Sequence, residues 1–272
     1  MIEAALRYQT KGKDWVKRVL IGSGVTFLAF ILFLPIFTVY GYMLEVMRRV
    51  LRGDTDTPPA WGDYDIVQLS LNGAKAFLIL FAYGLVVGFV ALLPAGVLFL
   101  LGAVLQSNSI TLLSTLVGSA LSLVSAVVIA VVAPIMIANF VIEDDLAAGF
   151  DLGVFRTFLT NRTMLRAIGL AILVNLAVSV VSSVLLVTVV GPAIVGFVGL
   201  SAVAYIWAAG FADAYREIHG ELPAIPDGPT KMAVGQSAGA GADATAAGAR
   251  SPTGVEDDKP TGPDPTDDER WD

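Results

Sequence analysis

Three long stretches without charged side chains divide this chain. No Asp, Glu, Lys, Arg or His occurs in residues 19–44, 76–142 or 167–212. The hydrocarbon core of a bilayer is about 30 Å thick and is crossed by about 20 helical residues. The second and third stretches are therefore each long enough for two spans. The pattern predicts an all-α, polytopic helical membrane bundle over residues 1–220, with about five to six membrane segments.

The predicted membrane segments are residues 19–44, 76–101, 110–142, 167–190 and 193–212. The first has two interpretations, because its 26 residues would form a helix of about 39 Å with Pro35 near the middle. It is either one tilted or kinked span, or a hairpin of two short helices broken near Pro35. Basic residues flank both of its ends, and this charge distribution favours the hairpin.

A basic segment follows the first stretch. In a helix Glu45 lies three and four residues before Arg48 and Arg49, so that the acid can pair with either base. Together with Arg52 and the nearby Trp61, these residues suit the boundary between hydrocarbon and anionic head groups. The segment is interpreted either as a membrane-flanking helix with a solvated loop or as a contact for lipid head groups or a partner.

The local sequence predicts two further helices outside the apolar stretches or beginning before them. Residues 2–8 are expected to form a short surface helix before the first apolar stretch. Asp65 followed by Gln68 has the spacing of a capping box, which predicts a helix that begins at Ile66 and runs into the second stretch.

The composition supports the membrane assignment and shows that the C-terminal tail differs from the rest of the chain. Hydrophobic residues make up 56% of the chain and charged residues 15%, outside the usual range of soluble domains. The formal net charge is −7, and the acidity lies in the tail, with 13 acidic and 5 basic residues from Asp213 onward. Residues 221–272 are rich in Gly, Ala, Pro and Asp, which predicts a disordered acidic tail.

Basic residues also suggest an orientation. They occur before the first stretch, in both long polar connections and in the tail, whereas the turns near Gln106 and Gly191 have none. Under the positive-inside rule, a multi-pass protein of the cell membrane would have its N-terminus and its tail in the cytoplasm.

The residues give no sign of catalysis. Intramembrane charges, which mark many transporters and proteases, are absent from the three stretches. The one histidine, His219, has no evident second metal ligand, and the chain has no cysteine. We therefore expect no catalytic, cofactor-binding or metal-binding residues, no nucleic-acid partner, and a protein that is not an enzyme.

Small and amide side chains stand out within the apolar stretches. Gly84 and Gly88 form a G-x-x-x-G pair, and Gly118 and Ser122 repeat the four-residue spacing. Such residues let helices approach closely, either inside the bundle or at a homo-oligomer face. The two most polar side chains are Asn139 and Asn175. Each is interpreted as an interhelical hydrogen-bonding group or as a solute ligand.

The order of three motifs resembles a known family. GYMLEVMRRVLRG is followed by PPAWGDY and then by DDLAAGFDLGVFRTFLTNR before the last pair of spans. Over about residues 1–220 this resembles domain-of-unknown-function family 4013, a group of prokaryotic, mostly archaeal, membrane proteins. At Pro58 and Ala60 the chain departs from the Leu-Pro-Glu run more usual in the family. The resemblance implies a compact helical membrane domain with the basic segment inside the cell, and no reaction.

Two functional hypotheses follow. The first is a non-enzymatic membrane domain that organises lipids or protein partners at the cytoplasmic face through its basic segments. The alternative is a carrier or channel for a neutral or lipidic solute that uses the Pro35 break and the region of Asn175. Membrane lipids are the expected partners in either case.

Overall fold

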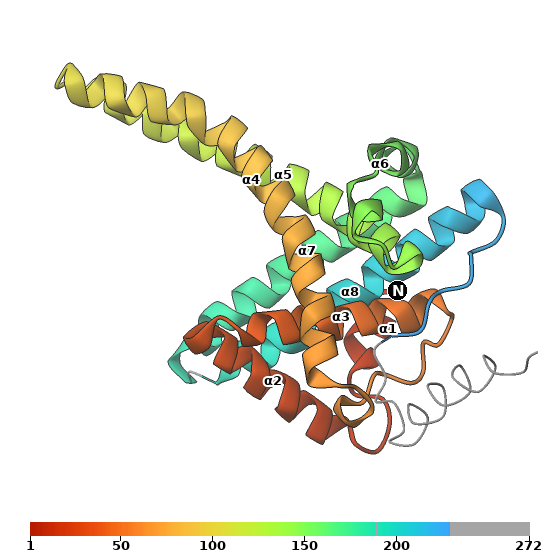
Figure 1. Ribbon diagram of the computed structural model, residues 1–272. Helices are drawn as coiled ribbons and strands as arrows, with labels where there is room; N and C mark the ends of the chain where they lie inside the picture. Colours follow the sequence, from red (N-terminus) through yellow and green to blue (C-terminus); the bar gives the residue numbers. More distant parts are fainter. Residues whose placement is uncertain (189, 229–272) are drawn as a thin grey trace, which may run out of the picture. The chain divides into compact units, whose positions relative to one another are not determined.

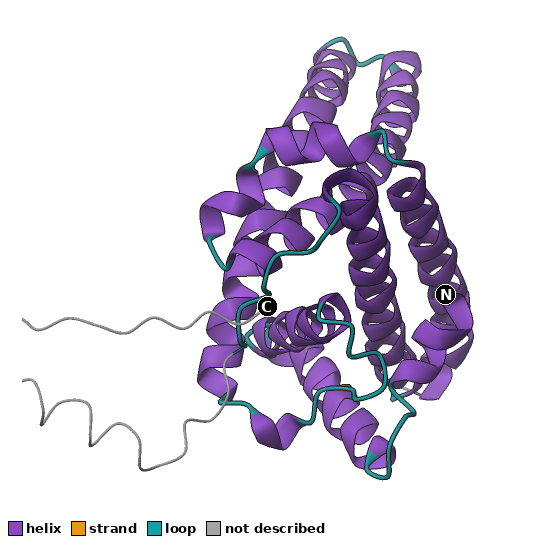
Figure 2. Cartoon of the chain, turned by 90° about the vertical axis from the view of Figure 1, so that its right-hand side faces the viewer, coloured by secondary structure: helices purple, strands orange, loops and turns teal. Residues whose placement is uncertain are grey.

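The computed structural model describes residues 1–188 and 190–228. Within them every regular element is a helix, and short loops join the helices (Figure 2). This agrees with the predicted all-α class. The expectation of a disordered tail concerns residues that lie almost wholly outside the described ranges.

Figure 1 shows how the helices are arranged, and their bounds follow the apolar pattern. The α-helices are α1 (Ile2–Tyr8), α2 (Trp15–Leu32), α3 (Pro35–Leu51), α4 (Ile66–Val104), α5 (Asn108–Glu143), α6 (Leu152–Leu159), α7 (Arg162–Val184) and α8 (Gly191–His219). Short 3-10 helices occur at η1 (Trp61–Asp63), η2 (Leu146–Phe150) and η3 (Leu185–Thr188). Five of the helices, α2, α4, α5, α7 and α8, are long and apolar enough to cross a membrane.

The first apolar stretch forms a helical hairpin. Helix α2 ends at Leu32, and the next residue, Phe33, has a φ of 60° that does not continue the helix. Pro35 is the first residue of α3, a position where its missing N–H costs nothing. At the other end of the hairpin, Lys11 Nζ lies 2.7 Å from Asp56 Oδ1. The two flanking segments therefore meet, as a hairpin requires and a single crossing forbids.

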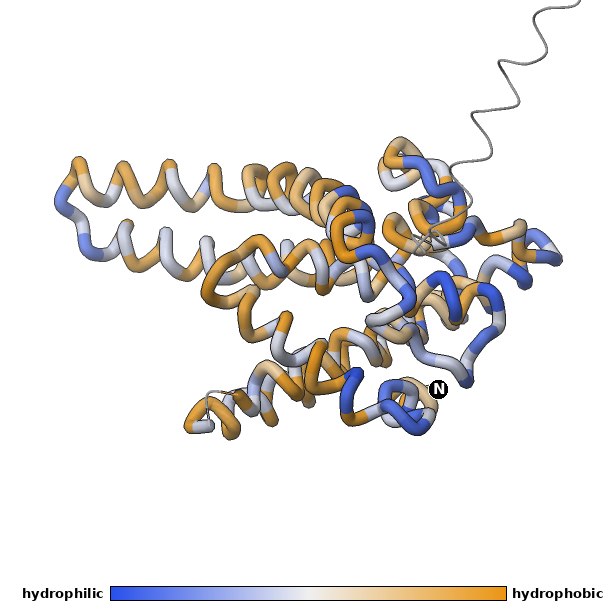
Figure 3. Tube along the Cα trace, turned by 60° about the horizontal axis from the view of Figure 1, so that its bottom comes forward, coloured by the Kyte–Doolittle hydropathy of each residue, from blue (hydrophilic) through white to orange (hydrophobic). Residues whose placement is uncertain are grey.

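The polar ends of the helices are tied to one another by side chains. Trp61 Nε1 donates to the Arg18 carbonyl at 3.1 Å, joining α2 to the loop after α3. Asn161 Nδ2 donates to Glu217 Oε2 at 3.0 Å, joining the start of α7 to the end of α8. Figure 3 shows these hydrophilic connections gathered on the right, away from the turn between α4 and α5 on the left.

Helices α4 and α5 form the longest arm. At 1.5 Å per residue they extend about 58 and 54 Å, well beyond a 30 Å hydrocarbon core. Pro94 and Pro134 lie inside them without ending either helix. The arm is held together by close packing: Ser114 Oγ donates to the Ala95 carbonyl at 2.7 Å, and Gly102 faces Thr111.

Four of the eight α-helices in the described residues, α4 to α7, begin with a side-chain cap. The predicted cap at Asp65 is confirmed, since its carboxylate accepts from the N–H groups of Val67 and Gln68. Asp151 caps α6 in the same way. At the other end of a helix, Gly53 has a φ of 86° directly after α3, which is the left-handed position that glycine adopts without strain.

Helix α3 is the most enclosed element, and it packs against α2, α4 and α8. Its crossing with α4 depends on two glycines. A Cβ on Gly41 would collide with the Leu69 carbonyl, and one on Gly73 would collide with the Phe37 carbonyl. The two backbones therefore touch, which only glycine at both positions allows.

The first part of the predicted tail differs from expectation. Residues 221–228 lie on the helical domain, with Leu222 and Ile225 packed against the core. Gly228 lies directly against the Glu45 carboxylate. The folded unit therefore continues past the boundary predicted at residue 220.

Candidate functional site: a cavity among the membrane helices

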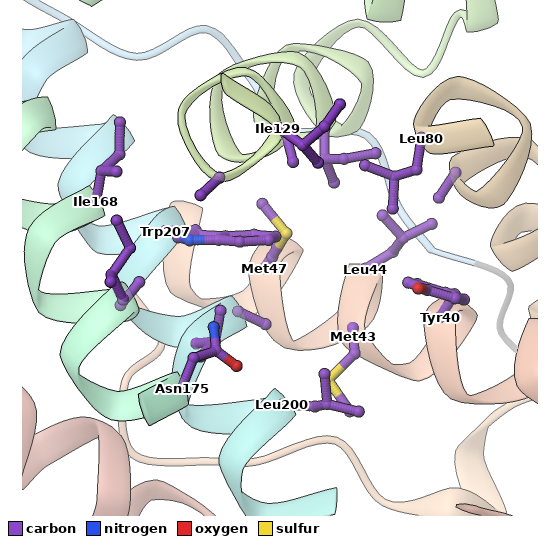
Figure 4. Close-up of a pocket in the computed structure, with 18 residues that line it drawn as sticks. Tyr40, Met43, Leu44, Met47, Leu80, Ile129, Ile168, Asn175, Leu200 and Trp207 are labelled. Atoms are coloured by element: carbon purple, nitrogen blue, oxygen red, sulfur yellow. The ribbon is translucent and has the colours of Figure 1, made fainter. Parts of the chain in front are cut away.

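A cavity of about 330 Å³ lies among α3, α4, α5, α7 and α8. Ten of its lining residues are labelled in Figure 4: Tyr40, Met43, Leu44, Met47, Leu80, Ile129, Ile168, Asn175, Leu200 and Trp207. The remaining lining side chains are apolar, and most are alanines. Its size lies at the lower end of the range for small-molecule sites, about 300–1,000 Å³.

The cavity exists because small residues face large ones. Ala133, Ala171 and Ala204 contribute short side chains from three different helices, and the indole of Trp207 lies beside Met47 (Figure 4). Helix α3 supplies one wall through residues spaced three and four apart, which share one face of a helix. The cavity is thus a product of how five helices meet.

The lining of the cavity includes exposed residues on α7 and α8. Ile172 on α7 is 42% exposed and Leu200 on α8 is 40% exposed, and both line it. Asn175 lies about 20 Å along α7 from Arg162, at 1.5 Å per residue. An α7 that crosses a bilayer about 30 Å thick from Arg162 would hold Asn175 within the hydrocarbon.

Two polar side chains face into this apolar space. Figure 4 shows the Asn175 amide and the Tyr40 hydroxyl turned toward the cavity from opposite sides. Neither makes a side-chain hydrogen bond to another group within residues 1–188 and 190–228. Because hydrocarbon offers no partners, an unpaired polar group at this depth is costly.

A smaller cavity of about 160 Å³ adjoins the first. It is lined from α2 and α3 by Thr26, Ala29 and Val39 among others, and it shares Tyr40, Met43 and Leu200 with the larger one. These three side chains therefore form the wall between the two cavities.

Next to the larger cavity, at the polar end of α3, lies a buried ion-pair network. Arg48 is 1% exposed and Glu45 is 3% exposed. The guanidinium pairs with the Glu45 carboxylate, and its Nη2 lies 2.7 Å from Asp144 Oδ1 at the end of α5. Burial raises the pKa of the Glu45 carboxyl, and Arg48 opposes that rise. The network joins α3 to α5 directly after the residues that line the cavity.

The predicted head-group residues are placed differently from expectation. Arg48 is in the interior, so the prediction that it contacts lipid head groups or a partner is wrong. Arg49 is half-buried and donates to the Thr57 carbonyl and the Tyr64 hydroxyl, at 2.9 and 3.1 Å. Arg52 donates to the Pro226 carbonyl and pairs with Asp227 at 3.0 Å.

Trp61, the fourth predicted contact, packs inside the polar end. Its indole stacks on the Tyr42 ring, with ring centroids 4.4 Å apart and planes inclined by 14°. The Tyr42 hydroxyl in turn donates to the Pro59 carbonyl at 3.0 Å. Trp61 therefore fastens the loop after α3 to the bundle.

The predicted packing residues divide into two groups. A Cβ on Gly118 would lie 3.3 Å from the Ala95 Cβ, where α5 packs on α4. A Cβ on Gly84 or Gly88 would meet no atom within 4 Å, and Ser122 is exposed. These three residues lie on an open face of the α4–α5 arm, where a homo-oligomer contact stays a prediction.

The two asparagines have different surroundings. Asn139 is buried, and its Nδ2 donates to the Ala148 carbonyl at 2.8 Å, as expected of a structural hydrogen bond. Asn175 lines the cavity, as the ligand interpretation requires. Sequence reasoning missed Tyr40, Trp207 and the Gly41–Gly73 crossing. The only signal for them was their place in apolar stretches, which dozens of other residues share.

The lining of the cavity is uncharged. Its lining has no Asp, Glu, Lys, Arg, His or Ser side chain. In the described part of the chain no group of three or more metal-ligating side chains comes together. The site can enclose an apolar molecule and offer it neutral hydrogen-bonding groups.

The fold defines the class: a helical integral membrane protein, which here has an apolar cavity among its helices. A family model described as "Protein of unknown function (DUF4013)" matches residues 25–187, and the chain belongs to that family. The matched region contains all three motifs of the predicted resemblance. No curated protein and no solved structure matches the chain.

Proposed function

We propose that this protein is a non-enzymatic membrane protein that takes a lipid-like molecule from the surrounding bilayer into its cavity. The observation that carries the proposal is the apolar cavity of about 330 Å³, whose lining includes the exposed residues Ile172 and Leu200. At these residues we place an opening toward the hydrocarbon of the bilayer. A membrane-soluble molecule reaches such an opening by lateral diffusion, without crossing water. The proposal thus favours the lipidic-solute hypothesis over a basic head-group platform, since Arg48, Arg49 and Arg52 donate to partners within the chain.

The orientation belongs to the same proposal. The basic residues around α1, α3 and α7 support a cytoplasmic polar end in the cell membrane. Partners that bind there would contact the loops around Asp56 and Asp145, which are exposed.

The test uses the tryptophan of the cavity as a reporter. Bromine quenches indole fluorescence on contact, so an alkyl chain brominated near its end reports entry when it quenches Trp207. The protein is held in detergent or nanodiscs, and Trp207→Phe supplies the signal of the other tryptophans. The expected result is saturable quenching that disappears in Trp207→Phe.

A matched pair of variants separates the cavity from general lipid contact. Ala171→Leu fills space in the cavity and should weaken binding at least tenfold. Ala177→Leu makes the same change on an exposed face of α7 and should bind like the wild type. Non-saturable quenching, or equal effects of the two variants, would overturn the proposal.

A further inference from the structure

The polar groups of the cavity distinguish between classes of lipid. An occupant must match a space that is apolar except at Tyr40, Asn175 and the indole of Trp207. Each of these side chains is uncharged. Any charged head group would therefore lose its hydration without gaining an opposite charge, which costs far more than burying a neutral group.

The nearest cation cannot serve a charged head group. Arg48 follows the lining residue Met47 in α3, but its guanidinium is enclosed by Glu45 and Asp144. Two carboxylates thus already neutralise it. An anionic head group at this site would meet acidic side chains rather than a free base.

An uncharged head group with a hydroxyl finds hydrogen-bonding partners in this cavity. The Asn175 amide carries both donors and an acceptor, and the Tyr40 hydroxyl can donate or accept. A hydroxyl likewise does both, so it can pair with either side chain in whatever orientation the ligand adopts. The two side chains face the cavity from opposite sides (Figure 4), which suits a head group with more than one hydroxyl.

We infer that the cavity selects an uncharged lipid with a hydroxylated head group, of the monoacylglycerol or long-chain alcohol kind, and that Asn175 and Tyr40 bind that head group. The inference rests on the proposed function, because it names the occupant of the same cavity. It adds a chemical selection that an apolar cavity alone would not produce. A plain hydrocarbon would leave both polar side chains unpaired.

Three brominated probes with the same chain length test the selection: a monoacylglycerol, a fatty acid at a pH where it is ionised, and a bromoalkane. Binding is measured by quenching of Trp207, with the Trp207→Phe signal subtracted. The monoacylglycerol should bind at least tenfold more tightly than either of the others. Equal affinity for the bromoalkane would show a cavity that accepts any apolar chain and would overturn the inference. Tighter binding of the ionised fatty acid would also overturn it.

Variants assign the selection to the two side chains. Asn175→Leu keeps a similar volume and removes the amide, and Tyr40→Phe removes only the hydroxyl. Each should lower the affinity for the monoacylglycerol about three- to tenfold, the effect of one hydrogen bond, and leave the bromoalkane unchanged. Ser183→Ala is a polar-to-apolar change on α7 outside the cavity. It should leave the affinities for both the monoacylglycerol and the bromoalkane unchanged.

The two proposals fail in different ways. If no probe quenches Trp207 saturably, the cavity takes no lipid and the proposed function is wrong. If all three probes bind equally and both variants behave like the wild type, the proposed function stands and the selection is wrong. Loss of bromoalkane binding in Asn175→Leu would show that this variant has damaged the cavity. The affinity of Tyr40→Phe for the monoacylglycerol and for the bromoalkane would then test the selection.

Discussion

At the scale of single residues, the buried ion pair of α3 has the largest energetic consequence. Arg48 and Glu45 have almost no exposure, and Asp144 completes the network from α5. A charge removed from water is stabilised only by its partners, so the loss of one partner leaves the other buried and uncompensated. The same chemistry on the surface contributes little, because water and salt screen it.

Replacing Arg48 by Met should destabilise the protein by about 3–5 kcal/mol, because Glu45 loses its counter-charge in the interior. The measurement is the free energy of unfolding in mixed micelles with increasing denaturing detergent. Arg7→Met, which breaks the exposed pair with Glu3, should cost less than about 1 kcal/mol.

A double variant identifies the cause. Glu45→Leu together with Arg48→Met removes both charges and should recover much of the loss. If the double variant is no more stable than Arg48→Met alone, lost packing of the arginine stem is responsible, and the ion-pair explanation is wrong.

At the scale of elements, α3 is the helix on which the others converge. It lines the larger cavity with four residues, contributes to the smaller one, and contacts the backbone of α4 at Gly41 and Gly73. Helix α4 also lines the larger cavity, through Ala76 and Leu80. A shift of α4 away from α3 would therefore change the shape of the cavity as well as the stability of the fold.

Gly73→Ala should be destabilising by about 1–3 kcal/mol, because the added methyl group overlaps the backbone of α3. Weaker binding of the brominated monoacylglycerol should accompany the loss. Gly88→Ala on the same helix is the control, since its methyl group would meet no atom within 4 Å. Its unfolding free energy should match the wild type or exceed it slightly, because alanine favours the helix. Equal destabilisation by both variants would mean that the crossing is not close.

At the scale of the whole helical domain, the hairpins bring the polar connections to one end. Lys11 pairs with Asp56, Arg48 with Asp144, and Asn161 with Glu217. These contacts link the N-terminus, the connection after α3, the end of α5 and the end of α8. The turn between α4 and α5 lies at the far end of its arm (Figure 3).

Single cysteines test this topology, because the chain has none of its own. Thr10→Cys, Thr57→Cys and Thr160→Cys should react with an impermeant thiol reagent from the same side of a sealed vesicle. Asn108→Cys should react only from the opposite side. With the proposed orientation, the first three are labelled in inverted vesicles. Labelling of Thr10→Cys and Thr57→Cys from opposite sides would show a single crossing at α2–α3 and contradict the hairpin.

Much of the fold was predictable because its signals are local. The charge-free stretches predicted the membrane helices, since a charge in hydrocarbon is excluded wherever it occurs. Pro35 and Asp65 marked a helix start, because a missing N–H and a capping carboxylate act within one turn. The order of the motifs also predicted the family, which the match over residues 25–187 confirms.

The tertiary structure alone decided which residues share a site. Arg48 and Arg49 are adjacent and chemically identical in the sequence, yet one is buried between two carboxylates and the other is half-buried and bonded to the loop after α3. Asn139 and Asn175 differ in the same way: one bonds to a carbonyl and the other faces the cavity. Local patterns determine where helices begin and end. Burial and cavities depend on how far-separated helices cross, and that information is spread over the whole chain.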